Sequence, residues 1–346
     1  MQIKSKRLMD INQTTTKKTF FFFVGLALLS FTTSLAQIKR NATITDFSSL
    51  KANPLIAVIE SEESQEVLNL KKKIASCKKE KKKSELQEEL HSIIKSSQDF
   101  NKLWKSAVTE IWKLNTTIEF KTIEEVKKLA KSGVKKYSVL MIKNYSAYAG
   151  DLNMSTNSLQ SSRIGFNYIA YSNIQNIDKF KKLDYLFFLQ KMNLEYNNST
   201  HDMAMYRFNL ALAQKHIKAI EFQKDSKLTL YDFVKQQKKL NCHKLDQLKV
   251  KVDKETLYKM ARKNPNKSFL KGHLDVVNKE TIAQLILNQD DQYIAIPLLS
   301  SFVKSSSLHY KIIVNTKTLE IISCTNRATA IDEFLRIDLK SISKCK

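Results

Sequence analysis

Glycine and proline are scarce in this sequence. The 346 residues include only 5 Gly and 3 Pro, so few positions suit the sharp turns that join many short strands. This scarcity argues against a many-stranded β-sandwich and favours long helices with modest loops. It also leaves no glycine-rich loop to cradle a phosphate, and neither a GxGxxG fingerprint nor a P-loop is present. A doubly wound dehydrogenase or a nucleotide hydrolase is therefore not expected.

Residues that commonly carry out chemistry are few and scattered. The sequence has no GxSxG and no HExxH motif, which excludes two familiar hydrolase signatures. The six histidines are His91, His201, His216, His243, His273 and His309. Cys242 and His243 come nearest to a metal-ligand pair, but adjacent side chains rarely bind one ion. We therefore predict no catalytic residue, no cofactor and no metal site.

Two weaker arrangements keep an enzymatic function open. A nucleophile pair would need Cys324 or Cys242 to approach His273 in space, although no neighbouring residue in the sequence activates either thiol. A carboxylate pair would need Glu119 and Asp275 to face each other across a pseudo-twofold axis. Such residues are more often exposed positions on an edge strand. An envelope hydrolase with a site of this kind is retained as an alternative function.

The first 36 residues have the layout of a secretory signal peptide. A basic leader ends in Lys17 and Lys18, and the apolar run Phe20–Phe31 follows. That run is short for a membrane span, and Ala36 completes a small-residue cleavage site. We expect cleavage after Ala36 and a periplasmic or secreted product. A retained membrane anchor is the alternative.

The chain is strongly basic. Its formal net charge is +24. The leader holds five basic residues against one acid, which leaves about +20 on residues 37–346. This charge favours anionic partners such as nucleic acid, lipid headgroups or acidic polysaccharide. The alternative is a lysine-rich background on solvated helix faces.

Four cysteines lie beyond the predicted cleavage site: Cys77, Cys242, Cys324 and Cys345. An exported chain permits two disulfides, and four cysteines allow three pairings. We expect Cys324 to pair with Cys345, because that bond would fix the C-terminal tail. Buried thiols without disulfides are the alternative.

One strand–helix–strand unit occurs twice. The first copy is Ile118–Ile142 and the second is Leu274–Leu298, which aligns without gaps at an offset of 156 residues (274 minus 118). Thr122 begins a TxxE capping box in the first copy, and Asn278 is a cap at the matching position. The aligned pairs include Ile118 with Leu274, Val126 with Ile282, Leu129 with Leu285, Tyr137 with Tyr293, and Ile142 with Leu298.

The two copies also differ. Ile123 falls on Lys279, and Gly133, a natural C-terminal helix cap, falls on Gln289. A strand–helix–strand pattern arises from shared physics as well as from duplication. Structural repetition is the interpretation we carry forward, and its origin stays open.

The first half contains an insertion. Apolar strands precede both copies, Leu55–Glu60 in the first half and Leu248–Val252 in the second. The spacing to the repeated unit is 57 residues after Glu60 and 21 after Val252, a difference of 36. Helical periodicity fills residues 64–114 and is broken at the lysine-rich stretch 78–84. We predict an antiparallel helical hairpin here, with a single long helix as the alternative.

These patterns predict an α/β fold with two similar βαβαβ-type halves. Further strands are expected at Ile164–Tyr171 and Tyr310–Val314, and helices at Asp178–Tyr196, Thr200–Gln223 and Leu230–Leu240. The expected organisation is a signal peptide (1–36), a first α/β half (37–175) with a hairpin at about 64–114, a helical connector (176–244) and a second α/β half (245–346).

Aromatic residues concentrate near a Ser- and Asn-rich segment, 144–162, which we interpret as a loop. They are Tyr145, Tyr148, Phe166, Tyr168 and Tyr171. Aromatic rings beside polar loop residues are typical of a ligand pocket or a sugar-binding face. Rings packed beneath a surface loop are the simpler alternative.

With its Lys- and Asn-rich composition, a leader ending in LAQ and alternating strands and helices, the chain resembles uncharacterised exported α/β proteins of Bacteroidota. The resemblance implies an envelope or periplasmic setting and no functional residue. Our leading hypothesis is a non-enzymatic exported binding or scaffold protein, with a cleft between the halves and the hairpin as a docking arm. Adhesion to an anionic polymer or membrane surface is a further alternative. The partner is unknown, and an anionic polymer or an envelope protein is the expected class.

Overall fold

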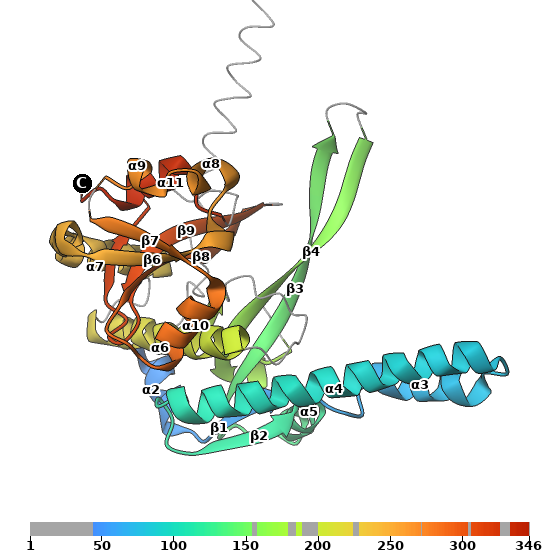
Figure 1. Cartoon of the computed structure of the whole chain (residues 1–346). Coiled ribbons are helices and arrows are strands. Elements are labelled where there is room, and N and C mark those ends of the chain that lie inside the picture. The colour runs from blue at the N-terminus through green and yellow to red at the C-terminus, as the bar shows by residue number, and fades with distance from the viewer. Residues whose placement is uncertain are drawn as a thin grey trace, which may run out of the picture. The chain divides into compact units, whose positions relative to one another are not determined.

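The fold is known from a computed structural model (Figure 1). It describes residues 44–153, 158–178, 185–188, 200–223, 228–270, 272–303, 306–325 and 333–345. For residues 44–46, 143–153, 158–168, 185–188, 299–303 and 306–308 it describes the backbone alone. The predicted signal peptide and its cleavage site lie outside the described residues. Among the described helices, none combines the length and apolar character needed to cross a bilayer.

Two five-stranded sheets have the same topology. The first has the order β2-β1-β3-β4-β5, and the second, read from its far edge, β7-β6-β8-β9-β10. The first-sheet strands are β1 (Leu55–Ile59), β2 (Ile118–Thr122), β3 (Ser138–Asn153), β4 (Ser158–Asn173) and β5 (Tyr185–Phe188). The second-sheet strands are β6 (Lys249–Asp253), β7 (His273–Val277), β8 (Tyr293–Val303), β9 (Ser306–Asn315) and β10 (Ile321–Cys324). The predicted α/β class with two sheet-containing halves is confirmed.

In each sheet, parallel strands give way to an antiparallel meander. The first strand pairs in parallel with the second and third, and the last three strands pair antiparallel. The predicted βαβ arrangement therefore holds for three strands of each half. β5 lies within the predicted helix Asp178–Tyr196, so that prediction is wrong there. Its YLFF sequence favours a strand, and its pairing with β4 extends the first sheet beyond residue 175.

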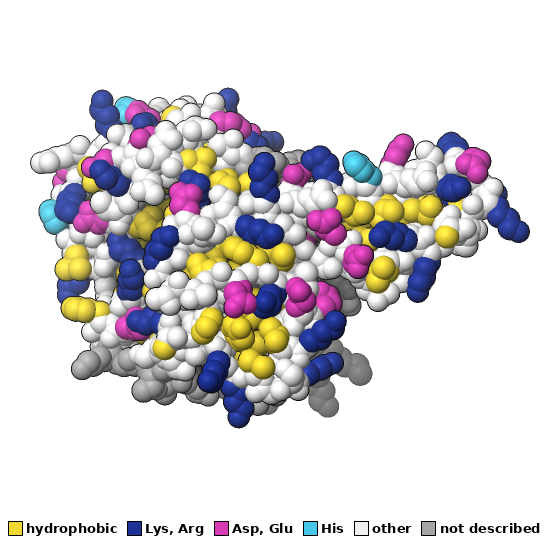
Figure 2. Space-filling model, turned by 90° about the horizontal axis from the view of Figure 1, so that it is seen from below, with side chains coloured by type: hydrophobic (Ala, Val, Ile, Leu, Met, Phe, Trp, Pro, Cys, Tyr) yellow, Lys and Arg dark blue, Asp and Glu magenta, His cyan; other side chains and the backbone are white. Residues whose placement is uncertain are grey.

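The helices are α2 (Ile44–Ala52), α3 (Gln65–Ser76), α4 (Glu80–Ile111), α5 (Ile123–Lys131), α6 (Thr200–Gln223), α7 (Leu230–Asn241), α8 (Lys259–Arg262), α9 (Pro265–Ser268), α10 (Lys279–Leu287) and α11 (Arg336–Ile342). Short 3-10 turns span Ile174–Asn176, Cys242–Gln247 and Lys254–Thr256. The predicted hairpin is confirmed, because α3 packs alongside α4 after a break at residues 77–79 (Figure 1). Basic side chains lie around its outer end (Figure 2).

The repeated unit keeps its helix boundaries and caps. α5 and α10 begin and end at positions 156 residues apart. Thr122 Oγ1 accepts from the Glu125 N–H, and Asn278 Oδ1 accepts from the Thr281 N–H. After each helix, Gly133 (φ +80°) and Gln289 (φ +52°) both have left-handed backbone geometry. The apparent mismatch between these two residues therefore conceals an equivalent C-terminal cap.

The ungapped alignment is wrong for the strand that follows. Leu55 pairs with Ser138 in the first sheet, whereas its counterpart Val250 pairs with Tyr293, an offset of 155 from Ser138. The connection before β8 (288–292) is one residue shorter than that before β3 (132–137). Strand side chains alternate between faces, so one residue changes which of them face the helix. At the offset of 155 residues, Val139 corresponds to Ile294. Val139 packs with α5, and Ile294 packs with α10.

Helix α6 joins the two halves. It is buried on nearly all sides and contacts both α4 and α10. Its Tyr206 packs edge-on against Phe100 and Trp104 of α4, with ring centroids 6.1 and 5.8 Å away. A helix that buries residues on most of its sides needs packing partners on each of those sides. One hydrophobic core therefore runs from the first sheet through α6 to the second sheet.

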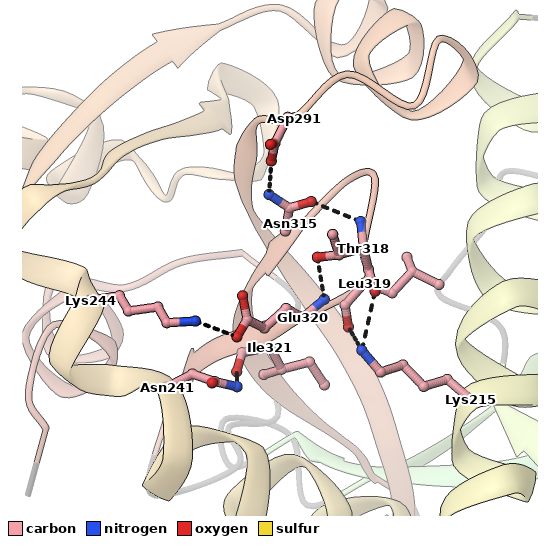
Figure 3. Close-up of polar contacts among 9 residues, drawn as sticks. All are labelled: Lys215, Asn241, Lys244, Asp291, Asn315, Thr318, Leu319, Glu320 and Ile321. Carbon is pink, nitrogen blue, oxygen red and sulfur yellow. Dashed lines mark hydrogen bonds and ion pairs between the residues drawn. The ribbon is translucent and has the colours of Figure 1, made fainter.

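Two adjacent residues of α6 attach it to opposite halves. Gln214 donates to the Ile111 carbonyl (2.8 Å) and accepts from the Lys113 N–H (2.7 Å), which binds the end of α4. Lys215 Nζ donates to the carbonyls of Thr318 (3.2 Å) and Leu319 (2.7 Å) in the β9–β10 turn (Figure 3). The interface between the halves is thus fixed by hydrogen bonds as well as by apolar packing.

The β9–β10 turn is itself held by side chains (Figure 3). Asn315 Oδ1 accepts from the N–H groups of Lys317 and Thr318, and its Nδ2 donates to Asp291 (2.7 Å). Lys244 pairs with Glu320 at 2.6 Å. These contacts keep the turn in position to receive Lys215.

The disulfide joins Cys242 to Cys345, with a Cα–Cα distance of 5.4 Å. The predicted Cys324–Cys345 pair is wrong. Cys324 packs into the core shared with α6, whereas Cys242 and α11, which precedes Cys345, pack in the cluster on the other face of the second sheet. Cys324 therefore faces away from the tail. Within the described residues, Cys324 and Cys77 are the cysteines that remain reduced.

Candidate functional site

The predicted aromatic ligand face falls on two paired strands rather than on a loop. β3 runs to Asn153 and β4 begins at Ser158, with Tyr145 opposite Phe166 and Tyr148 opposite Arg163. The backbone of Tyr168 pairs with β5 as well as with β3. The side chains of Tyr145, Tyr148, Phe166 and Tyr168 lie outside the described part of the structure.

Tyr171 is a core residue and not a ligand contact. Its side chain is fully buried, and its hydroxyl donates to Asn115 Oδ1 at 3.2 Å. The ring packs edge-on against Trp112 with centroids 5.1 Å apart. Asn115 in turn donates to the carbonyls of Leu50 and Asn53. Tyr171 is thus part of a buried polar network beneath the first sheet.

The structure does not assemble either catalytic arrangement. Cys242 is oxidised, and burial raises the pKa of the Cys324 thiol to about 11, the reverse of an activated nucleophile. His273 pairs with Asp275 at 2.9 Å, and Glu119 with Lys121 at 2.8 Å. Each carboxylate thus has a basic partner on its own strand. Across the described residues, no three His, Cys, Asp or Glu side chains are grouped to hold a metal ion.

A pocket of about 670 Å³ lies in the first half, at the carboxyl end of β1 and beside Met141 and Ile142 of β3. It is bounded by the middle of α4 and by the start of α5. Open α/β sheets commonly bind ligands at this edge, where successive connections leave on opposite faces. Here β1 leads to the α3–α4 hairpin on one face, and β2 leads to α5 on the other. The topology therefore places a pocket at the edge where a ligand is expected.

The pocket wall is held by side-chain contacts to the backbone of β1's end. Asn101 of α4 accepts from the Glu60 N–H (2.8 Å) and donates to the Glu60 carbonyl (2.9 Å). Ser64 caps α3 by accepting from the Val67 N–H. Gln98 donates to Glu62 at 3.0 Å. The end of the strand, the turn and the hairpin are thus joined into one rigid wall.

Both polar and apolar groups line the pocket. Ile59, Phe100 and Met141 contribute apolar surface, and five serines contribute hydroxyl groups. Ser96 and Ser92 stand about one and two helical turns before Phe100, on the same face of α4. Small-molecule sites generally combine apolar walls with a few polar groups in this way.

Acidic side chains predominate around the pocket. Among the described lining residues, Glu60, Glu66, Glu124 and Asp178 oppose Lys127, a formal balance of −3 on a strongly basic protein. Lys127 Nζ lies 3.7 Å from Asp178. Glu66 and Glu124 also occupy the first turns of α3 and α5, where they oppose the positive ends of the helix dipoles. The site is therefore suited to a cationic group and unsuited to an anion.

Among the described residues, the cavity at the interface between the halves is smaller. A cavity of about 90 Å³ there is lined by α4, α6, α10 and the β9–β10 turn, including Phe208, Ile286 and Leu319. A volume of this size suits a few waters rather than an organic ligand. The 670 Å³ pocket thus lies within one half and not in the cleft expected between the halves.

Sequence reasoning did not single out the pocket residues. The signal available in the sequence was the four-residue spacing of Ser92, Ser96 and Phe100, which interrupts an apolar face with hydroxyl groups. No protein-family model, curated protein or solved structure matches the chain.

Proposed function

We propose that the protein is a non-enzymatic, exported binding protein of the cell envelope that holds a small ligand in the first-half pocket. The observation that carries this proposal is the pocket at the carboxyl end of β1, with its apolar walls and surplus of carboxylates. Its volume of about 670 Å³ is within the range of small-molecule sites, about 300–1,000 Å³. The signal peptide predicted from residues 1–36 supports the envelope location.

The pocket chemistry favours a ligand with an amine group and an aliphatic body. An ammonium group would pair with the carboxylates of Glu66 and Glu124, and methylene groups would cover Ile59 and Phe100. Serine hydroxyls supply further acceptors. An anionic ligand would meet the same carboxylates and be repelled. A linear polyamine has both required features.

Calorimetric titration of residues 37–346 with spermidine tests this function. We expect one-site binding that Glu124→Gln weakens at least fivefold, because a charge-assisted hydrogen bond contributes about 1.5–3 kcal/mol. Glu280→Gln is the matched control, since Glu280 occupies the same position in α10 and is also exposed. We expect Glu280→Gln to bind spermidine as the parent chain does.

The outcomes separate the ligand class from the pocket itself. Equal weakening by both substitutions would assign binding to overall charge and reject the pocket. Binding of a neutral disaccharide, maltose, with no response to spermidine would reject the amine ligand. The Met141 methyl resonance gives a second readout in nuclear magnetic resonance titrations. Absence of binding to both probes by calorimetry and by this resonance would contradict a small-molecule role.

A further inference from the structure

The outer part of the α3–α4 hairpin is solvated on nearly all sides. The buried residues of α4 lie between Ser97 and Val108, and those of α3 are Val67 and Leu70. Residues 71–96 contain no buried side chain. Figure 1 shows this part of the hairpin extending beyond the first sheet. Neither the shared core nor the pocket requires its outermost turns.

The charges on this hairpin are segregated along its length. Its tip, residues 71–83, carries eight lysines and one acid, a formal charge of +7. The lysines are Lys71, Lys72, Lys73, Lys78, Lys79, Lys81, Lys82 and Lys83, and all but Lys83 are exposed. The adjoining shaft is acidic, since residues 60–70 hold four acids and residues 84–99 hold four acids against one lysine. About a third of the charge of residues 37–346 is thus concentrated at one end.

The composition of the tip indicates which kind of anionic partner it fits. Residues 71–99 contain no Phe, Tyr, Trp or Arg. Base stacking and bidentate phosphate recognition, which characterise nucleic-acid binding, are therefore not available. The bend at residues 77–83 also lacks a large apolar side chain that would enter a hydrocarbon layer. The tip therefore offers a cluster of lysine ammonium groups, which attract anions by charge alone.

The arrangement of the charges favours a surface over a strand. A linear polyanion follows a groove or a stripe of basic residues, and along this hairpin it would soon meet the acids of the shaft. A planar anionic surface can instead meet the hairpin end-on, where lysines of both α3 and α4 lie close to the break at residues 77–79. The acidic shaft would then be repelled and point away from it. We infer that the hairpin tip docks the protein on an anionic lipid bilayer through its lysines, without insertion.

Vesicle sedimentation tests this docking. The probe is a vesicle of about 30% phosphatidylglycerol in phosphatidylcholine at low salt, where a lysine near an anionic surface strengthens binding several-fold. Replacing Lys78, Lys79, Lys81 and Lys82 with Gln should lower the affinity of the protein for these vesicles at least tenfold. The matched control replaces Lys254, Lys259, Lys263 and Lys267, four exposed lysines of the second half, and removes the same total charge. We expect little change in the control.

Each outcome decides the proposal. Equal weakening of both variants would assign binding to net charge, and no weakening of the tip variant would reject the tip. Tip-dependent retention on heparin without vesicle binding would identify a polymer as the partner and overturn the membrane assignment. Binding should also fall steeply as salt is raised. Unchanged thermal melting and spermidine titration of the tip variant would show that folding and the pocket are intact.

Discussion

At the scale of single residues, the two left-handed helix ends show how one backbone geometry is met by two side chains. Gly133 adopts φ +80° at no steric cost, and Gln289 adopts φ +52° against the preference of a residue with a Cβ atom. A Cβ atom at Gly133 would meet nothing within 4 Å. A side chain at Gly133 would therefore cost free energy through the left-handed backbone and not through a steric clash.

Exchanging these residues should have opposite effects. We expect Gln289→Gly to raise the free energy of unfolding by about 1 kcal/mol and Gly133→Gln to lower it by about the same amount. Urea unfolding of each single variant measures both changes. If Gln289→Gly lowered the free energy of unfolding, the contacts of the Gln289 side chain would stabilise the fold by more than its left-handed backbone costs.

His216 should make stability depend on pH. It is buried in α6 against the Leu228 carbonyl (3.2 Å), and burial lowers its pKa from 6.5 to about 4. Below pH 6.5 the unfolded chain takes up a proton that the folded chain does not. The free energy of unfolding is therefore undiminished by His216 above pH 6.5. Below that pH it falls by about 1.4 kcal/mol per pH unit towards pH 4.

Urea unfolding at pH 7.5 and pH 5 checks this dependence. The parent chain should lose roughly 2 kcal/mol from His216 over that interval, and His216→Gln should lose correspondingly less. His243→Gln, at an exposed histidine, is the control. A pH dependence that both variants share would exclude His216 as its source.

At the scale of elements, the disulfide fixes the C-terminal helix to the start of the second half. Cys345→Ser should lower the free energy of unfolding by about 2–5 kcal/mol, because the bond closes a loop across 103 residues. Cys324→Ser should leave the disulfide unchanged. Peptide mapping without reduction measures the pairing directly. A peptide that links Cys324 to Cys345 would contradict the structure.

Local sequence and sheet geometry contribute differently to these elements. Thr122 and Asn278 set the starts of α5 and α10 through contacts three residues away, so the sequence predicts both helices. The position of β8 depends on its pairing with β6, and the shorter connection before Tyr293 moves it by one residue. That shift is invisible in an ungapped alignment, since both registers present apolar residues.

At the scale of the whole molecule, α6 connects the two halves through packing and hydrogen bonds. Its side chains belong to a core that both sheets share, and Gln214 and Lys215 bind opposite halves. We expect a single unfolding transition. Both tryptophans, Trp104 and Trp112, pack beside the first sheet, so their fluorescence reports on that half while far-ultraviolet circular dichroism reports on both.

Coincident urea transitions by fluorescence and circular dichroism would demonstrate this cooperativity. Gln214→Ala should lower the transition midpoint, since it leaves the Ile111 carbonyl and the Lys113 N–H without this partner. Gln236→Ala, on an exposed pair with Gln223, is the control. Two separated transitions in the parent chain would show that the halves fold independently.

The two halves, the hairpin and the repeated helix with its caps can be predicted from the sequence alone. Those features depend on side-chain periodicity and on contacts within a few residues. The partner of Cys345, the burial of Tyr171 and the pocket beside Glu60 follow only from the packed chain. Each of these depends on which face of a sheet a residue occupies and on which distant element covers it. Sequence spacing is the same for either face, so only the packed chain distinguishes them.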